Sequence, residues 1–184
     1  MTKAVAPRSF ARDRVLEAAQ ALFAEHGVSG TSLQMIADRL GVNKSAVYYQ
    51  FHSKDDIVAE VFRPAFEDIT RVLAIAQAIE SPEVRREATL SGMIELAVRH
   101  RRTTALVHTD PAVAVLIQAI TEFRDAFHRL RAILAGPDPD PVARTTAAVL
   151  VSGIFGAAAD PEAADIPNEE LHRMLLECSR RLVG

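Results

Sequence analysis

Cysteine is nearly absent from this sequence, since Cys178 is the single one among 184 residues. A lone cysteine excludes an internal disulfide and is typical of a reducing compartment, where we expect it to be a small buried hydrophobe. The polar, basic residues 1–14 lack the apolar segment of a signal peptide. The longest almost uncharged run, residues 145–159, is shorter than the roughly 20 residues of a membrane span. We therefore expect a cytoplasmic protein with no membrane partner.

Runs of alternating β-branched or aromatic residues are also missing, and aromatic residues make up only 5% of the chain. Hydrophobic residues make up 49%, with Ala and Leu plentiful, which is enough for a substantial core. This combination predicts an all-α protein.

Common catalytic motifs are lacking as well. The sequence has no glycine-rich phosphate loop, no paired Cys/His set and no nucleophile elbow. His100 and His108 are not spaced as an i, i+4 metal pair, and no cysteine joins them. We predict that the protein is not an enzyme and has neither a metal site nor a cofactor.

Charge is unevenly distributed along the chain. The formal net charge is −3, but residues 1–54 carry seven Lys or Arg and four Asp or Glu, which leaves +3 there and −6 in the remainder. A basic N-terminal part on an acidic body is typical of a DNA-binding module joined to another unit.

The N-terminal part has the start and stop signals of short helices. We expect a first helix over residues 9–26, with Ser9 as its N-cap. Thr31, followed three residues later by Gln34, has the pattern of a capping box, so a second helix is expected to begin there and to end at the next glycine.

Two further caps follow at once. Asn43 is expected to cap a third, short helix over residues 44–50, and Ser53 with Asp56 to open a long fourth helix towards residue 80. Two helices of this length around a short glycine-containing turn have the dimensions of a helix-turn-helix.

The rest of the chain also has helical patterns. Helices are expected over residues 82–101, 110–134, 141–158 and 168–182, with a short segment at 103–108 and a breaker at 136–141. The pattern over 110–134 leaves open a bend before Phe123. We predict a DNA-binding domain over residues 1–54 and a helical effector-binding and dimerisation domain over residues 55–184.

The segment Ala21–Val58 resembles the DNA-binding signature of the tetracycline-repressor (TetR) family of bacterial transcriptional regulators. The residues that carry this likeness are Leu22, Phe23, Gly27, Thr31, Ile36, Ala37, Gly41, Val42, Tyr48, Tyr49, Phe51, Ser53 and Lys54. The resemblance implies an N-terminal three-helix helix-turn-helix domain followed by a helical bundle. It further implies that the bundle dimerises through its last two long helices and holds a small-molecule pocket.

The third helix carries the expected DNA contacts. Lys44 at its start can donate to a guanine, Ala46 can approach a thymine methyl, and Tyr48 lies one turn beyond Lys44 on the same face. The resemblance and these roles together give a predicted DNA-binding set of Thr31, Ser32, Asn43, Lys44, Ser45, Tyr48, Tyr49, Gln50 and Lys54. As alternatives, one of the tyrosines packs in the core and Thr31 is only a helix cap. Gln50 departs from the family pattern, which often has His there.

Small residues at four-residue spacing in the helix over 141–158 let another helix approach closely. The predicted dimer interface is Ala148, Ser152, Ile154, Phe155, Gly156, Leu171, Leu175, Cys178 and Leu182. The alternative is an intramolecular helix pair.

Apolar residues of the central helices, with two histidines, form the predicted effector site. They are Phe66, Ile69, Met93, Leu96, His100, His108, Leu116, Ile120, Phe123 and Phe127, and the apolar ones could equally be core. The arginines around His100 (Arg99, Arg101, Arg102) are typical of a solvated face, with an anionic effector as the alternative. Pro64 interrupts the fourth helix, and we hypothesise that ligand binding shifts this helix and changes the separation of the two recognition helices.

Together these observations predict a ligand-responsive repressor that binds a palindromic double-stranded DNA operator as a homodimer and is released by a small-molecule effector. The alternative is an effector-independent or corepressor-dependent DNA-binding regulator. A pure protein-interaction bundle would leave Lys44 and the tyrosines unexplained.

Overall fold

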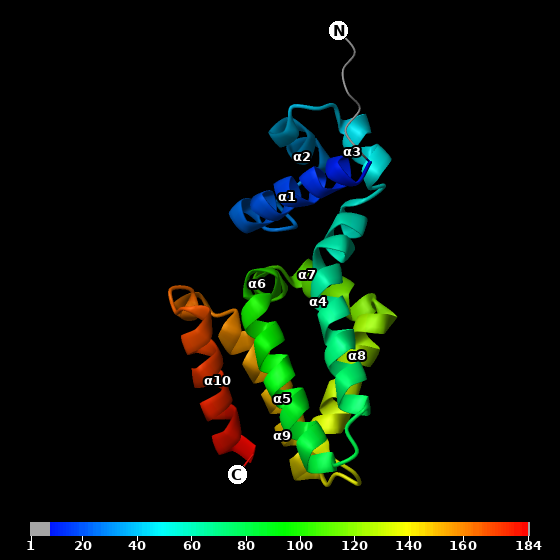
Figure 1. Cartoon of the computed structure of the whole chain (residues 1–184). Coiled ribbons are helices and arrows are strands. Elements are labelled where there is room, and N and C mark those ends of the chain that lie inside the picture. The colour runs from blue at the N-terminus through cyan, green and yellow to red at the C-terminus, as the bar shows by residue number, and fades with distance from the viewer. Residues whose placement is uncertain (1–7, 184) are drawn as a thin grey trace.

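The computed structural model describes residues 8–183, which contain helices and no strand, so the all-α prediction is confirmed. The helices are α1 (Arg8–His26), α2 (Leu33–Leu40), α3 (Lys44–Gln50), α4 (Lys54–Gln77), α5 (Pro82–Arg99), α6 (Arg101–Thr109), α7 (Pro111–Ala119), α8 (Thr121–Ala135), α9 (Pro141–Ala158), the 3₁₀ turn η1 (Pro161–Ala163) and α10 (Asn168–Val183). Figure 1 shows α1–α3 grouped at one end, which we call the head. The remaining helices form the longer body, and α4 runs from one to the other.

Two of the expected helix starts are wrong by one residue. The first helix begins at Arg8, so Ser9 lies inside it and is not its N-cap. The N-cap of α2 is Ser32, whose hydroxyl accepts from the Met35 N–H at 3.2 Å, and not Thr31. Because the Gln34 side chain donates to Asp38 instead of reaching back, α2 has no capping box.

The other two caps of the head are confirmed. The Asn43 side chain accepts from the Ala46 N–H at 3.1 Å at the start of α3. Ser53 and Asp56 each accept from the other's backbone N–H at 3.0 Å, which is the expected capping box of α4. Each such cap satisfies backbone donors that a helix leaves unpaired at its first turn.

The body has a break at the place where the sequence left a bend open. The segment expected to be helical over residues 110–134 is two helices, because Ile120 is extended (φ −75°, ψ 108°) between α7 and α8. Ile120 packs against the core that also contains Ile117 and Phe123, so the break turns both helices towards the same apolar cluster. By contrast, α4 is continuous through Pro64, which lies on its exposed side.

The apolar interior has two clusters. The body cluster joins α4, α5, α8, α9 and α10 around Met93, Ile94 and Leu130. The head cluster joins α1–α3 to the first turns of α4, and it also takes in Leu106 and Val113 from the body. The predicted domain boundary after residue 54 stays a prediction, but the apolar core of the head includes residues that follow this position.

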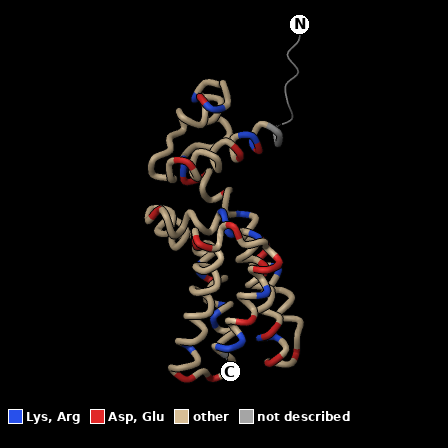
Figure 2. The backbone as a smooth tube through the Cα atoms, turned by 90° about the vertical axis from the view of Figure 1, so that its left-hand side faces the viewer, with Lys and Arg blue, Asp and Glu red and all other residues tan. Residues whose placement is uncertain are grey.

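Charges of both signs are interspersed along the body, as Figure 2 shows. Several pairs link neighbouring helices, such as Arg180 with Glu87 at 2.6 Å between α10 and α5. Exposed pairs of this kind contribute little to stability, about 0–1 kcal/mol each. Apolar burial therefore carries most of the stability of the bundle.

In the part of the chain that the structure describes, α9 alone is long and apolar enough to cross a membrane, by length and composition only. It packs against α5, α8 and α10 and contributes Leu150, Val151 and Ile154 to the body cluster. A core helix of a bundle meets the same criterion, so this finding by itself does not indicate a membrane protein.

Candidate nucleic-acid interface and ligand cavity

The short helix α3 is held by one apolar side chain and presents the others to solvent. Val47 is 0% exposed in the head cluster, whereas Tyr48 is 52% exposed and Tyr49 65% exposed. Lys44 and Ser45 are exposed as well. Neither tyrosine is therefore in the core, which removes one of the alternatives left open by the sequence.

The first turn of α3 is fixed by its cap. The Asn43 side-chain oxygen accepts from the Ala46 N–H and also from the Ser45 hydroxyl at 3.0 Å. Because the cap holds both neighbours, the Lys44 side chain projects from a rigid turn. Such a turn suits a residue that must reach base edges in a groove.

Thr31 has a structural role inside the head and does not have the predicted role of a DNA contact. Its side chain is buried (3% exposed), and its hydroxyl donates to the Gly27 carbonyl at 2.8 Å and to the Leu22 carbonyl at 3.2 Å. A buried hydroxyl with this bonding is not accessible to a phosphate, so the prediction of Thr31 as a DNA contact is wrong. Ser32 next to it is exposed at the N-terminus of α2.

Lys54 also makes contacts within the head. Its ammonium group donates to the carbonyl of Val28 at 2.6 Å and to that of Thr31 at 3.1 Å, and so holds the turn before α2 against the start of α4. Its role as a contact to the DNA backbone stays a prediction.

The sequence prediction missed two residues beside α3. His52 is exposed, and its ring meets that of Tyr48 edge-on at 5.2 Å. Arg12 donates to the Gln50 carbonyl at 3.0 Å, and its guanidinium lies 4.1 Å above the Phe51 ring. Arg12 thus fixes the end of α3 against α1, and its distance in sequence explains why no local pattern indicated it.

A buried carboxylate connects the head to the body. Asp110, 5% exposed, caps α7 by accepting from the Ala112 N–H, and it accepts from the Ser29 backbone N–H at 2.6 Å and the Ser29 hydroxyl at 2.9 Å. The bond from the Ser29 N–H is the main cause that holds the pKa of Asp110 below its usual value. Ser29 lies in the turn between α1 and α2, so Asp110 joins this turn to the corner between α6 and α7.

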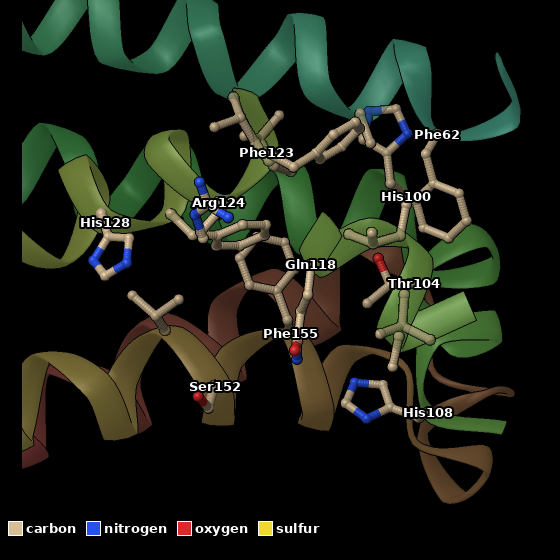
Figure 3. A pocket seen from close by; sticks show the side chains of 18 of the residues that line it. Phe62, His100, Thr104, His108, Gln118, Phe123, Arg124, His128, Ser152 and Phe155 are labelled. Carbon is tan, nitrogen blue, oxygen red and sulfur yellow. The ribbon is translucent and has the colours of Figure 1, made fainter. Parts of the chain in front are cut away.

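The body contains a partly open cavity of about 560 Å³ between α4 and α9. Figure 3 shows Phe123 and Phe155 near its middle and His128 and His108 towards opposite ends in that view. Six residues of the predicted effector site line it, namely Ile69, Leu96, His100, His108, Phe123 and Phe127. A volume of this size is within the range of small-molecule sites.

The other four residues predicted for the effector site lie elsewhere. Met93 is fully buried in the body cluster, while Leu116 and Ile120 are partly buried against the head cluster. Phe66 packs on Phe123 with ring centroids 4.6 Å apart, behind the cavity wall. Lining residues that the sequence did not indicate include Phe62, Thr104, Gln118, Arg124, Arg131 and Phe155.

On one side of the cavity, polar side chains already bond to other residues of the body. The His100 ring lies 2.9 Å from the Asp68 carboxylate, and this bond is the main cause that lowers the pKa of Asp68. Arg99 pairs with Asp68 and Glu95, and Arg101 donates to backbone carbonyls near η1. Arg99 and Arg101 are thus engaged within the body, and neither they nor Arg102 line the cavity.

The residues predicted for the dimer interface fall into three groups. Ile154, Leu171 and Leu175 are buried in the body cluster, so for them the intramolecular alternative holds. Phe155 lines the cavity, and Ala148 and Gly156 are partly exposed. Ser152, Cys178 and Leu182 are exposed.

The expectation that Cys178 is buried within the chain is therefore wrong. Met174 and Leu182 are also exposed on α10, the helix that carries Cys178. On α9, Val142 and Val149 are exposed. These residues are exposed on two helices that contact each other. Among residues 8–183, no group of three His, Cys, Asp or Glu side chains could hold a metal ion.

The comparisons with known proteins agree with this arrangement. Residues 15–61 match the family model "Bacterial regulatory proteins, tetR family". The chain is 29% identical over 102 residues to the HTH-type transcriptional repressor KstR2 of Mycolicibacterium smegmatis, a match that covers 55% of this chain and 49% of that protein. The chain thus spans about half the length of the curated relatives it matches.

Solved structures extend the likeness over the body. The structure of ketosteroid transcriptional regulator KstR2 of Mycobacterium tuberculosis has a TM-score of 0.71 at 19% identity and covers 98% of this chain and 95% of that chain. The fatty acid degradation regulator FadR of Bacillus halodurans has a TM-score of 0.71 at 15% identity and covers 99% of this chain and 97% of that chain. At such identities the likeness shows the fold alone. The relatives are named as transcriptional regulators and not as enzymes.

Proposed function

We propose that the chain, whose residues 15–61 match the model of the TetR family of bacterial regulatory proteins, belongs to that family and is a transcriptional repressor. It binds a palindromic operator in the cytoplasm as a homodimer and leaves it when a small molecule occupies the body cavity. The observation that carries the proposal is the capped helix α3, which exposes Lys44, Tyr48 and Tyr49 on a head joined to a body with a cavity.

The chemistry of α3 supports recognition of DNA. A helix fits the major groove, and a lysine at its start can donate to the O6 and N7 atoms of guanine. The hydroxyl of Tyr48, one turn along, can donate to a base edge or a phosphate. Ser32 and the free N–H groups at the start of α2 suit a phosphate beside the groove.

The exposed apolar surface of α9 and α10 supports the homodimer. Val142, Val149, Met174 and Leu182 are large apolar side chains left in solvent on adjacent helices. A second copy of the same surface, related by a two-fold axis, would bury them in a four-helix interface. Such an axis also matches the symmetry of a palindromic operator.

The corner between α6 and α7 supports a response to ligand. His108 and Ala114 line the cavity on either side of Asp110, which binds Ser29 in the head. A ligand that displaces this corner would move the turn before α2. It can do so only if it binds the released conformation more tightly than the DNA-bound one.

The test uses the full chain and a duplex recovered by selection from a randomised library. We expect a dimer by sedimentation and an affinity that falls steeply with salt, because Lys and Arg displace counterions from phosphates. Arg86→Ala, which removes one exposed charge on α5, is the control for Lys44→Ala. Salt-insensitive binding, or equal affinity of the two variants, would contradict the proposal, and a dimer that needs a ligand in order to bind would indicate the corepressor alternative.

A further inference from the structure

The polar lining of the cavity has one sign of charge. Arg124 and Arg131 line it together with His100, His108 and His128, and none of the described lining residues is Asp or Glu. The nearby carboxylate of Asp68 is already bonded to His100, Arg99 and Arg71. An anion bound in this cavity would therefore lie close to cationic side chains, and no carboxylate that lines the cavity would repel it.

The two arginines lie on one face of α8. Arg124, His128 and Arg131 follow one another at four- and three-residue spacing, which places them in a row along the helix. His128 and Arg131 have no hydrogen bond or ion pair with any residue in the range 8–183, and Arg124 only approaches its neighbour Asp125 at 4.0 Å. By contrast, the exposed Arg180 on α10 does have an acidic partner, Glu87.

The apolar part of the cavity begins directly beside this row. Phe123 and Phe127 come from the same helix α8, and the Phe127 ring meets that of Phe155 edge-on at 5.5 Å. Ile69 and Leu96 continue the apolar wall from α4 and α5. Figure 3 shows Arg124 beside Phe123 and Phe155, so cationic and apolar side chains line the same space.

We propose that the ligand of this cavity is an anionic amphiphile, with an acidic head at Arg124 and Arg131 and an apolar body among Phe123, Phe127 and Phe155. The proposal rests on the proposed function in that it names the chemical class of the effector. A guanidinium forms two parallel bonds to a carboxylate or phosphate oxygen pair, so the two arginines favour an anionic head over a neutral one.

Calorimetric titration of the full chain without DNA tests this directly. The probes are decanoate, decyl phosphate, decan-1-ol and decylamine, all below the concentrations at which they form micelles. We expect the two anions to bind at least about tenfold more tightly than the alcohol, and the amine not to bind, because charged hydrogen bonds are worth more than neutral ones. The preferred anion identifies the head group.

Substitutions in and beside the cavity show where the probes bind. Arg124→Gln with Arg131→Gln is expected to weaken decanoate by about tenfold or more while leaving decan-1-ol unchanged. Arg129→Gln, an exposed arginine of the same helix outside the cavity, is the matched control. Ala65→Phe, which fills part of the cavity, is expected to weaken both probes, and thermal unfolding confirms that each variant is folded.

Equal binding of decanoate and decan-1-ol, unchanged decanoate binding by the double variant, or no binding of either anion would overturn the inference. These outcomes are separate from the proposed function. The effect of Lys44→Ala on DNA binding tests the proposed function without any decanoate. If decanoate binds the cavity but does not release DNA, the proposed release by a ligand is contradicted, while the proposed chemical class of the ligand still stands.

Discussion

In the head, the side chains proposed to read the bases come from one helix of seven residues and point outward, as Lys44, Tyr48 and Tyr49 do. In the body, the cavity is lined by residues of six helices, α4 to α9, that point inward. A groove of DNA is large and can be read by a convex element, whereas a small molecule must be enclosed to lose its water. The head therefore depends on local geometry, and the body depends on how distant segments pack.

If the head and the body were separate folding units, they would unfold independently of each other. Leu130→Ala in the body cluster removes a fully buried side chain and should lower the free energy of unfolding by about 2–5 kcal/mol. Because the head cluster includes Leu106 and Phe123, we expect head and body to unfold in one transition. Urea unfolding, followed by circular dichroism and by loss of DNA binding, measures both. Arg129→Ala, exposed on α8, should change the stability by less than about 0.5 kcal/mol, and two separate transitions would contradict the shared core.

The link between the two regions is Asp110. Asp110→Ala should lower the free energy of unfolding by about 3 kcal/mol at neutral pH, since it leaves charge-assisted bonds to Ser29 unmade. The pKa of Asp110 is lowered in the folded state, so its contribution is complete above the unfolded value of about 3.9 and is lost as the pH falls through the folded value.

Urea unfolding of wild type and Asp110→Ala at several pH values checks this. The difference between them should be constant near neutral pH and should shrink below about pH 4. Asp125→Ala, which removes an exposed carboxylate on α8, is the control. A difference that grows as the pH falls would have the wrong sign.

Thr31 sharpens the distinction between structural and DNA-contacting residues in the head. Thr31→Val leaves the carbonyls of Gly27 and Leu22 without the hydroxyl donor and should cost about 1.5 kcal/mol of stability. The folded variant should bind DNA with unchanged affinity at temperatures well below its unfolding. A loss of affinity in the fully folded variant would return Thr31 to the set of DNA contacts.

Asn43 has the smallest expected effect. Asn43→Ala removes the cap of α3 and should cost about 1 kcal/mol, while Asn43→Ser should recover most of it because serine is an equally good cap. Chemical unfolding of the two variants side by side measures the difference. If serine were no better than alanine, the bond to the Ala46 N–H would not be what stabilises this turn.

Features of the head that depend on neighbouring residues could be predicted from the sequence. Asn43 and Ser53 cap the helices that follow them, since each cap lies within three residues of the N–H group that donates to it. The choice between Thr31 and Ser32 failed because both are good caps. The outcome depends on the Leu22 carbonyl, nine residues away, which takes the Thr31 hydroxyl.

Features of the body that depend on long-range packing could be predicted only in part. The apolar pattern indicated Ile69, Leu96 and Phe127 correctly as inward-facing, but it could not separate a cavity wall from solid core, which is where Met93 lies. Arg124 and Arg131 have the pattern of surface residues, since nothing local shows that a void opens beside them. The break at Ile120 likewise lacks a glycine or proline to mark it.

The most direct test of the central claim is selection of the purified protein against a randomised duplex library, repeated with Lys44→Ala and Tyr48→Phe. The account predicts an inverted repeat with half-sites about one helical turn apart, the spacing of about 34–36 Å at which a dimer places two recognition helices in successive grooves. It also predicts weaker enrichment by the Lys44→Ala variant. Recovery of no sequence, with binding that does not change when Lys44 is replaced, would contradict a DNA-reading head.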